Sequence, residues 1–193
     1  MNAPRSLGAD YFEGIFKSDE DPWHLASSDY ERRKFDRTIA VLQDRRYAAA
    51  LEVGCAHGVL TERLQEVCDH LLAIDISETA LRRAKERLAE RPQAQFAAMA
   101  FPRQSPTGTF DLCLLSEVAY YWDPDDLALA ARWMTEHLAP GGRALLVHYN
   151  GATDYPCSAD EAVSALEQAT AGCFTRCLAE RHDGYRLDLW GRL

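Results

Sequence analysis

The stretch ALEVGCAHGVLTERL (residues 50–64) joins the pattern of a buried strand to the pattern of a helix through a short turn. Its first residues form a mostly apolar run, and residues 59–67 have the apolar spacing of a helix. The same succession of a strand and a helix recurs along the chain. This alternation predicts an α/β fold built on a parallel, doubly wound sheet.

The other elements follow from the same patterns. Strands are expected at residues 70–75, 94–99, 110–116 and 143–149, and helices at residues 77–90 and 123–138, with PGG (residues 140–142) as a turn before the last of these strands. The end of the chain departs from the alternation, because a helix at 158–172 precedes two strands, 174–181 and 185–193, that flank HDG as an antiparallel hairpin. Residues 1–46 carry two helical stretches around the loop SDEDPWHLASSDY.

Composition favours one domain and a small-molecule ligand. The chain has 193 residues, of which 47% are hydrophobic, as is ordinary for one globular domain with a substantial core. We expect a single domain over residues 1–193, with residues 1–46 as a helical lid and residues 49–193 as the core. The formal charge of −9 disfavours general binding to nucleic acid or anionic lipid, although a local basic patch stays possible.

The sequence indicates a cytoplasmic protein. Its start, MNAPRSLGAD, lacks the layout of a secretory signal, and no apolar run approaches the roughly 18 residues of a membrane span. None of the six cysteines lies in a CxxC motif, so they are expected to be reduced packing residues. Cys173 and Cys177 form the only close pair, in a stretch that alternates like a strand, and no metal site is expected there.

The turn after the first strand has small side chains. Gly54 allows the chain to turn sharply, while Cys55, Ala56 and Gly58 let a ligand approach the backbone at the start of the helix. Asp75 ends the next strand, where a carboxylate can accept both ribose hydroxyls of an adenosine. The alternative is a turn that only packs helix on strand, and the position of Asp75 favours a nucleotide site.

Two classes of nucleotide ligand use such a turn. A dinucleotide or phosphate binder has the spacing GxGxxG, whereas EVGCAHG lacks that spacing and places the acidic Glu52 ahead of the turn. S-adenosylmethionine (SAM) carries a sulfonium and an ammonium group but no phosphate, so that a nearby carboxylate favours its binding. The residues therefore favour SAM as the cofactor.

Four motifs together resemble the class I SAM-dependent methyltransferases, namely LEVGCAHG, AIDIS, FDLCLLSEVAYYW and LAPGGRALLV, over about residues 49–149. The motif DPWHL, ahead of this core, narrows the resemblance to the NodS-type group, which is named for a rhizobial nodulation N-methyltransferase. The resemblance implies a Rossmann-like, mostly parallel sheet of seven strands with an antiparallel C-terminal hairpin strand. It also implies S-adenosyl-L-homocysteine (SAH) as the product of the cofactor.

The resemblance implies which residues bind the cofactor. One group shapes the methionine end of the site, a second meets the ribose and adenine, and a third lines the sulfonium end. In chain order these positions are Glu52, Gly54, Cys55, Ala56, Gly58, Asp75, Ile76, Met99, Ala100, Phe101 and Ser116.

Two of these positions depart from the family pattern. Ala100 stands where the family commonly has an Asp that bonds the adenine amine, so that the flanking Met99 and Phe101 and backbone groups would have to hold the ring. Ala56 stands where many members have glycine, and its methyl group is small enough to be tolerated.

Candidates for the acceptor side follow the strand 110–116 or end the strand 143–149. Glu117 lies at the carboxyl edge, where ligands bind in parallel sheets, and alternatively stabilises a helix N-terminus. Tyr120 and Tyr121 can offer a π face and phenolic hydrogen bonds, although one of two adjacent aromatic residues commonly packs in a core. His148 can act as a base near neutral pH, with a purely structural role as the alternative.

The N-terminal segment supplies the remaining candidates. Trp23 is expected in a lid that covers the cofactor, with Tyr30 and either Lys34 or Arg33 near the methionine carboxylate. The alternative for Trp23 is a packing contact between the first helix and the sheet.

The sequence thus predicts a SAM-dependent methyltransferase that acts on a small molecule, with an amine nitrogen as the expected acceptor. Such a transfer is an in-line displacement, so the enzyme mainly holds the acceptor lone pair behind the methyl carbon and excludes water. Two alternatives stay open. One is an oxygen or sulfur acceptor, which for a hydroxyl requires a base such as His148, and the other is a module that binds SAM without turnover. A monomer and a homodimer are both compatible with the sequence.

Overall fold

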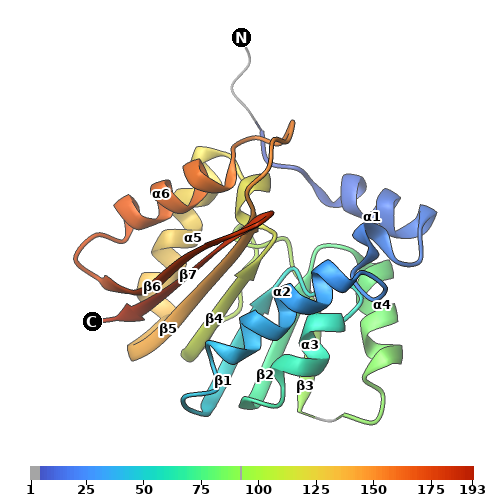
Figure 1. Ribbon diagram of the computed structural model, residues 1–193, viewed down its shortest axis with the longest axis horizontal. Coiled ribbons are helices and arrows are strands. Elements are labelled where there is room, and N and C mark those ends of the chain that lie inside the picture. The colour runs from blue at the N-terminus through green and yellow to red at the C-terminus, as the bar shows by residue number, and fades with distance from the viewer. Residues whose placement is uncertain (1–4, 92) are drawn as a thin grey trace. The chain divides into compact units, whose positions relative to one another are not determined.

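The computed structural model describes residues 5–91 and 93–193 (Figure 1). The chain divides into two compact units. The first contains residues 8–99, and the second contains residues 100–193 together with the N-terminal residues up to Leu7. Strands alternate with helices in both units, as the sequence predicts. The description as a single domain with an N-terminal lid stays a prediction.

The first unit contains three parallel strands. They are β1 (Tyr47–Val53), β2 (Cys68–Asp75) and β3 (Ala94–Ala98), and they pair in the order β3-β2-β1. The helices are α1 (Ala9–Ser18), α2 (Asp29–Ala40), α3 (Val59–Leu64) and α4 (Glu78–Arg87), with a 3-10 turn, η1 (Pro22–His24), between α1 and α2. Because β1 and β2 are parallel, the turns that follow them meet at one edge of the sheet.

Local sequence explains how these helices begin. Ser28 and Ser77 cap α2 and α4, since each hydroxyl accepts a bond from a backbone N–H in the first helical turn. Gly58 caps α3 with a positive φ of 84°. A Cβ atom at Gly58 would lie 2.9 Å from Cδ1 of Leu88 and 3.1 Å from Cβ of Ala84, so only glycine lets this turn pack against α4.

The second unit contains four strands of mixed direction. They are β4 (Phe110–Ser116), β5 (Leu138–Tyr149), β6 (Phe174–His182) and β7 (Tyr185–Arg192), in the order β4-β5-β7-β6. β4 and β5 are parallel, while β7 pairs antiparallel with both β5 and β6. The helices α5 (Pro124–His137) and α6 (Ala159–Ala169) contact each other and β5, and a 3-10 turn, η2 (Ala119–Tyr121), follows β4.

The N-terminal residues of the second unit are attached to the start of α5. The backbone N–H of Asp123 donates to Oγ of Ser6 at 2.9 Å, and the N–H of Ser6 donates to Oδ2 of Asp123 at 3.3 Å. The N–H of Leu7 donates to the carbonyl of Tyr121 at 3.0 Å. The chain is therefore held beside η2 before it enters α1.

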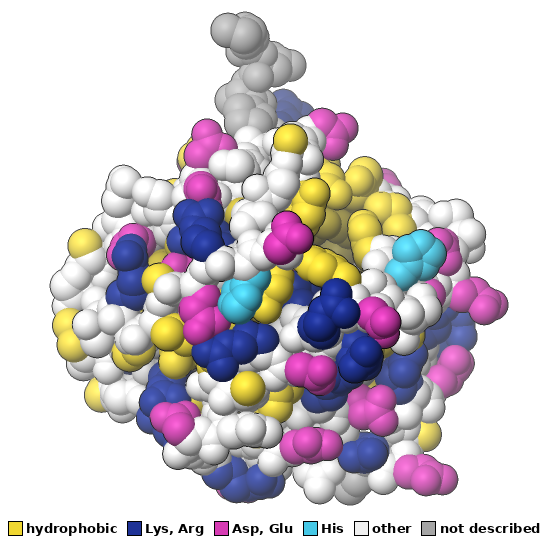
Figure 2. Space-filling view, viewed as in Figure 1, with side chains coloured by type: hydrophobic (Ala, Val, Ile, Leu, Met, Phe, Trp, Pro, Cys, Tyr) yellow, Lys and Arg dark blue, Asp and Glu magenta, His cyan; other side chains and the backbone are white. Residues whose placement is uncertain are grey.

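The surface carries charges of both signs. Figure 2 shows basic side chains interspersed with acidic ones on the face drawn there, rather than gathered in a patch of one sign. Among the described residues, no helix has both the length and the apolar composition that would be needed to cross a membrane.

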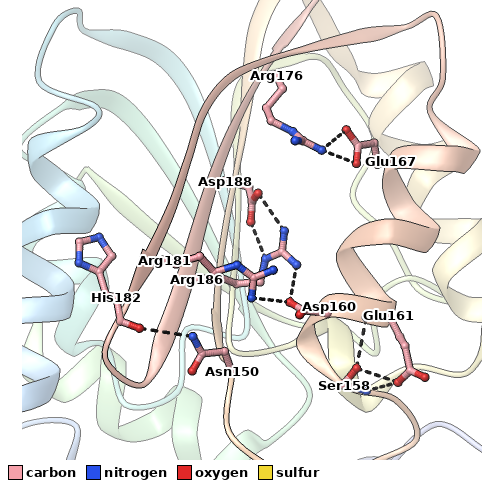
Figure 3. A network of polar contacts seen from close by, with 10 residues as sticks. All are labelled: Asn150, Ser158, Asp160, Glu161, Glu167, Arg176, Arg181, His182, Arg186 and Asp188. Atoms are coloured by element: carbon pink, nitrogen blue, oxygen red, sulfur yellow. Dashed lines mark hydrogen bonds and ion pairs between the residues drawn. The ribbon is translucent and has the colours of Figure 1, made fainter.

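A network of ion pairs joins the C-terminal hairpin to α6 (Figure 3). Arg186 is buried and makes two bonds to the carboxylate of Asp188, at 2.7 and 3.0 Å. Its Nη1 also donates to Asp160, in the first turn of α6, at 2.6 Å, and Arg181 binds the same carboxylate at 2.8 Å. The network thus fixes the start of α6 against β7.

The elements differ from the sequence prediction mainly at their ends. Residues 138–142, expected as the end of a helix followed by a turn, belong to β5, where Gly141 has a positive φ of 74° and the register against β4 shifts. The helices α3, α4 and α6 end three residues earlier than expected, because their last residues form turns. Strand β4 and the hairpin around Asp183 and Gly184 lie where the sequence predicts them.

Candidate functional site

The turn after β1 is held in an unusual backbone conformation. Gly54, Ala56 and Gly58 all have positive φ, at 76°, 50° and 84°. The N–H groups of Gly54 and Cys55 both donate to the carbonyl of Ile74, at 2.8 and 3.0 Å. These two bonds fix the turn against the end of β2.

Asp75 bridges the two turns at this edge. Its Oδ2 accepts the N–H of Ala56 and its Oδ1 accepts the N–H of Ser77, both at 2.8 Å. Burial raises the pKa of Asp75 to about 6, although these backbone bonds act to lower it. A carboxylate has about four acceptor positions, so Asp75 has the capacity to accept ligand hydroxyls as well.

Glu52 is a second buried carboxyl group beside the turn, with 1% of its surface exposed. Burial raises the pKa of Glu52 to about 7, and the negative charge of Asp75 acts in the same direction. Burial also raises the pKa of the Cys55 thiol well above its ordinary value. A bound cation would favour the ionised carboxylates and offset part of their desolvation.

The N-terminal candidates form two groups in the first unit. Trp23 is 42% exposed, has a positive φ of 60°, and contacts Phe16 edge-on at a ring distance of 5.7 Å. Lys34 is buried and pairs with Glu31 at 2.9 Å, with its Nζ 5.4 Å from the ring centre of Tyr30. A role of Lys34 toward the methionine carboxylate stays a prediction, and Glu31 is the partner that sequence reasoning missed. Arg33, next to Lys34 on α2, is exposed.

Met99 extends the edge of the first unit. Its N–H donates to the carbonyl of Asp75 at 3.0 Å, and Ile76 is half-buried next to Asp75. The structure therefore brings together the candidates of the first unit that lie at the ends of β1 and β2 or follow β1, β2 and β3: Glu52, Gly54, Cys55, Ala56, Gly58, Asp75, Ile76 and Met99.

Glu117 is hydrogen-bonded to Tyr120, another candidate of the second unit, and to the backbone of Tyr149. It has a positive φ of 58°, and its N–H donates to the carbonyl of Val147 at 2.8 Å. Its Oε2 accepts the hydroxyl of Tyr120 at 2.5 Å and the N–H of Tyr149 at 2.8 Å. A non-glycine residue in this conformation at a strand end is typical of a functional position.

Three tyrosine rings pack together next to Glu117. Tyr120 lies 4.7 Å from Tyr121 and 5.3 Å from Tyr155, between ring centres, and Tyr121 lies 4.7 Å from Tyr155. Tyr120 and Tyr121 are both buried, and burial raises the pKa of each phenol. Tyr155 was missed from the sequence, because it lies in an irregular loop between β5 and α6 that carries no periodic pattern.

His148 is fully buried beside this cluster. Its Nε2 accepts the N–H of Ala119 at 3.1 Å, so the neutral imidazole carries its proton on Nδ1. This contact favours the structural role that the sequence leaves open. A catalytic role of His148 stays a prediction.

Of three further candidates of the second unit, Ala100 and Phe101 make structural contacts and Ser116 is buried. The N–H of Ala100 donates to Oε1 of Gln104 at 3.0 Å. The ring of Phe101 packs between Trp122 and Trp133, at 5.6 and 5.3 Å. Ser116 is buried at the end of β4.

The six cysteines are free thiols in the structure. Cys173 precedes β6 instead of lying within it, and Cys177 is exposed where the register of β6 against β7 shifts. In the part of the chain that is described, no three His, Cys, Asp or Glu side chains are grouped in a way that could hold a metal ion.

The family model described as Nodulation protein S (NodS) matches residues 16–157. The chain belongs to the NodS family. Nodulation protein S of Rhizobium tropici is 31% identical over 174 residues, which cover 89% of this chain and 70% of that protein. The NodS family member of Bradyrhizobium diazoefficiens is 33% identical over 123 residues, and the match spans 63% of this chain and only 59% of that relative.

A solved structure of the NodS family supports the same fold. It is the N-methyltransferase NodS from Bradyrhizobium japonicum WM9 in complex with SAH, with a TM-score of 0.83 and 24% identity, covering 96% of this chain and 99% of that one. The predicted fold class is confirmed: the sheet is seven-stranded, mostly parallel and Rossmann-like, with antiparallel C-terminal strands.

Proposed function

We propose that this protein is a SAM-dependent methyltransferase that methylates an amine nitrogen of a small molecule and releases SAH. The observation that carries the proposal is the tight turn after β1, which lies against the buried carboxyl groups of Glu52 and Asp75 in a chain of the NodS family. The solved relative that is named as an N-methyltransferase with SAH bound supports the cofactor and the nitrogen acceptor.

The residues of the first unit fit this cofactor. Asp75 offers acceptor positions for ribose hydroxyls, and Glu52 offers negative charge for a ligand that carries an ammonium and a sulfonium group. Gly58 has no side chain and Ala56 only a methyl group, so neither adds bulk to the turn. A phosphate ligand fits less well, because two carboxylates would repel it.

Methyl transfer needs little dedicated chemistry from the protein. Bound SAM would supply an electrophilic methyl group. The acceptor nitrogen forms a C–N bond with its lone pair while the C–S bond breaks, and the electron pair of that bond goes to sulfur. The nitrogen must therefore arrive without its extra proton, and it can lose a further proton after transfer.

The residues at the end of β4 and after it are the ones proposed to bind the acceptor. Glu117 takes up hydrogens of the amine, since its carboxylate is already aligned by Tyr120 and by the N–H of Tyr149. Tyr120 and Tyr121 are hydrogen-bonded phenols, and their raised pKa keeps them neutral. In this proposal the two phenols therefore orient the acceptor, and Glu117 accepts the proton that the acceptor amine loses. An oxygen acceptor is less favoured, because Nε2 of His148, the expected base, is bonded to the backbone.

Partners and location belong to the same proposal. We expect a small-molecule acceptor, no nucleic-acid or membrane partner, a cytoplasmic location and a monomer or homodimer. The net charge of −9 disfavours a polyanionic partner, and the face drawn in Figure 2 shows charges of both signs interspersed.

Calorimetric titration with SAM, SAH, NAD and ATP tests the cofactor. We expect selective micromolar binding of SAM and SAH, and selective binding of NAD or ATP would contradict the proposal. Incubation with SAM and a library of amines, alcohols and thiols then tests the reaction through SAH formation. Turnover with amines supports the nitrogen acceptor, turnover with alcohols or thiols alone overturns it, and tight binding without turnover favours a non-catalytic module.

A further inference from the structure

Glu13, on α1, lies outside the residues that the sequence singles out. Its Oε2 accepts the hydroxyl of Ser77 at 2.6 Å and the N–H of Thr79 at 3.2 Å, while its Oε1 accepts the hydroxyl of Thr79 at 2.7 Å. Lys17, one turn further along α1, lies 3.3 Å from the same carboxylate and is largely exposed. Glu13 therefore ties α1 to the first turn of α4.

Ser77 connects this contact to the end of β2. Its N–H donates to Oδ1 of Asp75, and its hydroxyl donates to Glu13 while accepting the N–H of Ala80 at 3.1 Å. Ser77 is fully buried, so its two donor groups are fixed between the two carboxylates. Ser77 therefore connects the carboxylate of Glu13 to that of Asp75 by one hydrogen bond to each.

The segment that follows α1 contacts the turn after β1. Nε2 of His57, inside that turn, lies 3.3 Å from Oδ1 of Asp21, and its ring lies 6.5 Å from the ring of Phe16. Arg83, on α4, donates to the carbonyl of Asp19 at 2.7 Å. Phe16 is the one buried side chain of α1, so polar contacts contribute much of what holds the segment in place.

We propose that Glu13 is a positioning residue of the cofactor site. It fixes Ser77 and thereby orients the carboxylate of Asp75. The inference rests on the proposed function, because it takes Asp75 as the group that binds the ribose. Hydrogen bonds from Ser77 and Thr79 lower the pKa of Glu13 to about 2, which keeps its carboxylate ionised at assay pH.

The first test compares the affinity for SAH of the wild type with three variants. Glu13→Ala is expected to weaken binding about tenfold, since it removes the charged acceptor of two hydroxyls and one N–H. Glu13→Gln keeps one acceptor oxygen, so its affinity for SAH is expected to lie between those of the wild type and Glu13→Ala. Glu78→Ala is the matched control: Glu78 is exposed at the start of α4, the helix that Glu13 contacts, and its removal should leave the affinity unchanged.

The second test asks whether Glu13 acts through Asp75. If it does, the double variant Glu13→Ala/Asp75→Ala binds SAH as weakly as Asp75→Ala alone. The inference is overturned if the losses of affinity for SAH in the two single variants add up in the double variant. It is also overturned if both Glu13 variants bind SAH like the wild type, or if Glu78→Ala loses as much affinity as Glu13→Ala. Circular dichroism checks folding, and Glu13→Gln carries the test if Glu13→Ala is unfolded. A wild type that binds no SAH overturns the proposed function, and this inference with it, before any variant is compared.

Discussion

Glu52 carries a carboxyl group in surroundings that disfavour its charge. Its pKa of about 7 in the folded protein lies above the ordinary value of 4.5. The neutral form of Glu52 therefore favours folding at low pH, and this contribution is lost as the pH rises through 7. An unfavourable buried charge of this kind is typical of a residue that binds a ligand rather than one that stabilises the fold.

Replacing Glu52 with Gln should therefore stabilise the ligand-free protein at high pH. At pH 8 the variant is expected to gain on the order of 1–3 kcal/mol in free energy of unfolding, and this gain should be smaller at pH 5. Urea denaturation at the two pH values measures it, with Glu66→Gln as an exposed control. An equal effect at both pH values would contradict the assignment.

Ala56 has a positive φ, a conformation that costs a side chain about 1 kcal/mol or more. Replacement of Ala56 with Gly should relieve this cost and raise the free energy of unfolding by up to about 1 kcal/mol, partly offset by the greater freedom of glycine in the unfolded chain. The N–H that binds Asp75 is kept, so the affinity for SAH should stay within twofold, or about 0.4 kcal/mol. Thermal unfolding with and without SAH measures both the stability and the SAH affinity of Ala56→Gly. A clear loss of stability in this variant would argue against strain at Ala56.

At the scale of elements, the hairpin and α6 depend on a buried ion pair. Arg186→Leu leaves the carboxylate of Asp188, which is 2% exposed, without its partner. We expect a loss of about 3 kcal/mol, because breaking a buried pair leaves an uncompensated charge. Arg176→Leu is the matched control on the same hairpin, since Arg176 and Glu167 are about half exposed and such pairs contribute less than about 1 kcal/mol. Chemical denaturation measures the free energy of unfolding of both variants. Equal losses in Arg186→Leu and Arg176→Leu would refute the role of burial.

Elements with strong periodicity could be predicted from the sequence, and those shaped by tertiary contacts could not. FDLCLLS and the hairpin around HDG carry unambiguous patterns, and both lie where expected. The start of β5 was missed because PGG reads as a turn, whereas pairing with β4 continues across it with a shift in register. The long-range contacts of Glu13 and Tyr155 have no local signal, since each depends on residues far away in the sequence.

For the whole molecule, cofactor binding and stability should be linked through the same carboxyl groups. SAH at about 100 times its dissociation constant should add about 2.7 kcal/mol to the free energy of unfolding. At one fixed concentration the stabilisation should be larger at pH 8 than at pH 6, because Glu52 and Asp75, with pKa values of about 7 and 6, must lose protons to bind the ligand. Thermal unfolding across this range measures it, and a stabilisation that falls with rising pH would exclude these groups.

The architecture as a whole was predictable because it depends on pattern and order along the chain. Three predictions are confirmed: the alternation of strands and helices, the antiparallel strands at the C-terminal end, and the membership of the NodS family. The residues predicted to bind the cofactor near β1 and β2 lie together because they end these strands or immediately follow them, and their role toward the cofactor stays a prediction. The roles of Lys34 and His148 are harder to read from sequence, because a buried cation or imidazole acquires its partner, Glu31 or the N–H of Ala119, only in the folded chain.

The exposed thiol of Cys177 lies on β6, at one end of the strand order of the second unit, where the ladder is irregular. Two molecules can meet there and oxidise to a covalent dimer during storage in air. Such a species would imitate a homodimer in sizing experiments, so a reducing agent or Cys177→Ser is needed before any count of subunits is interpreted. The same thiol offers a natural attachment point for a fluorescent label, remote in sequence from the residues assigned to cofactor and acceptor.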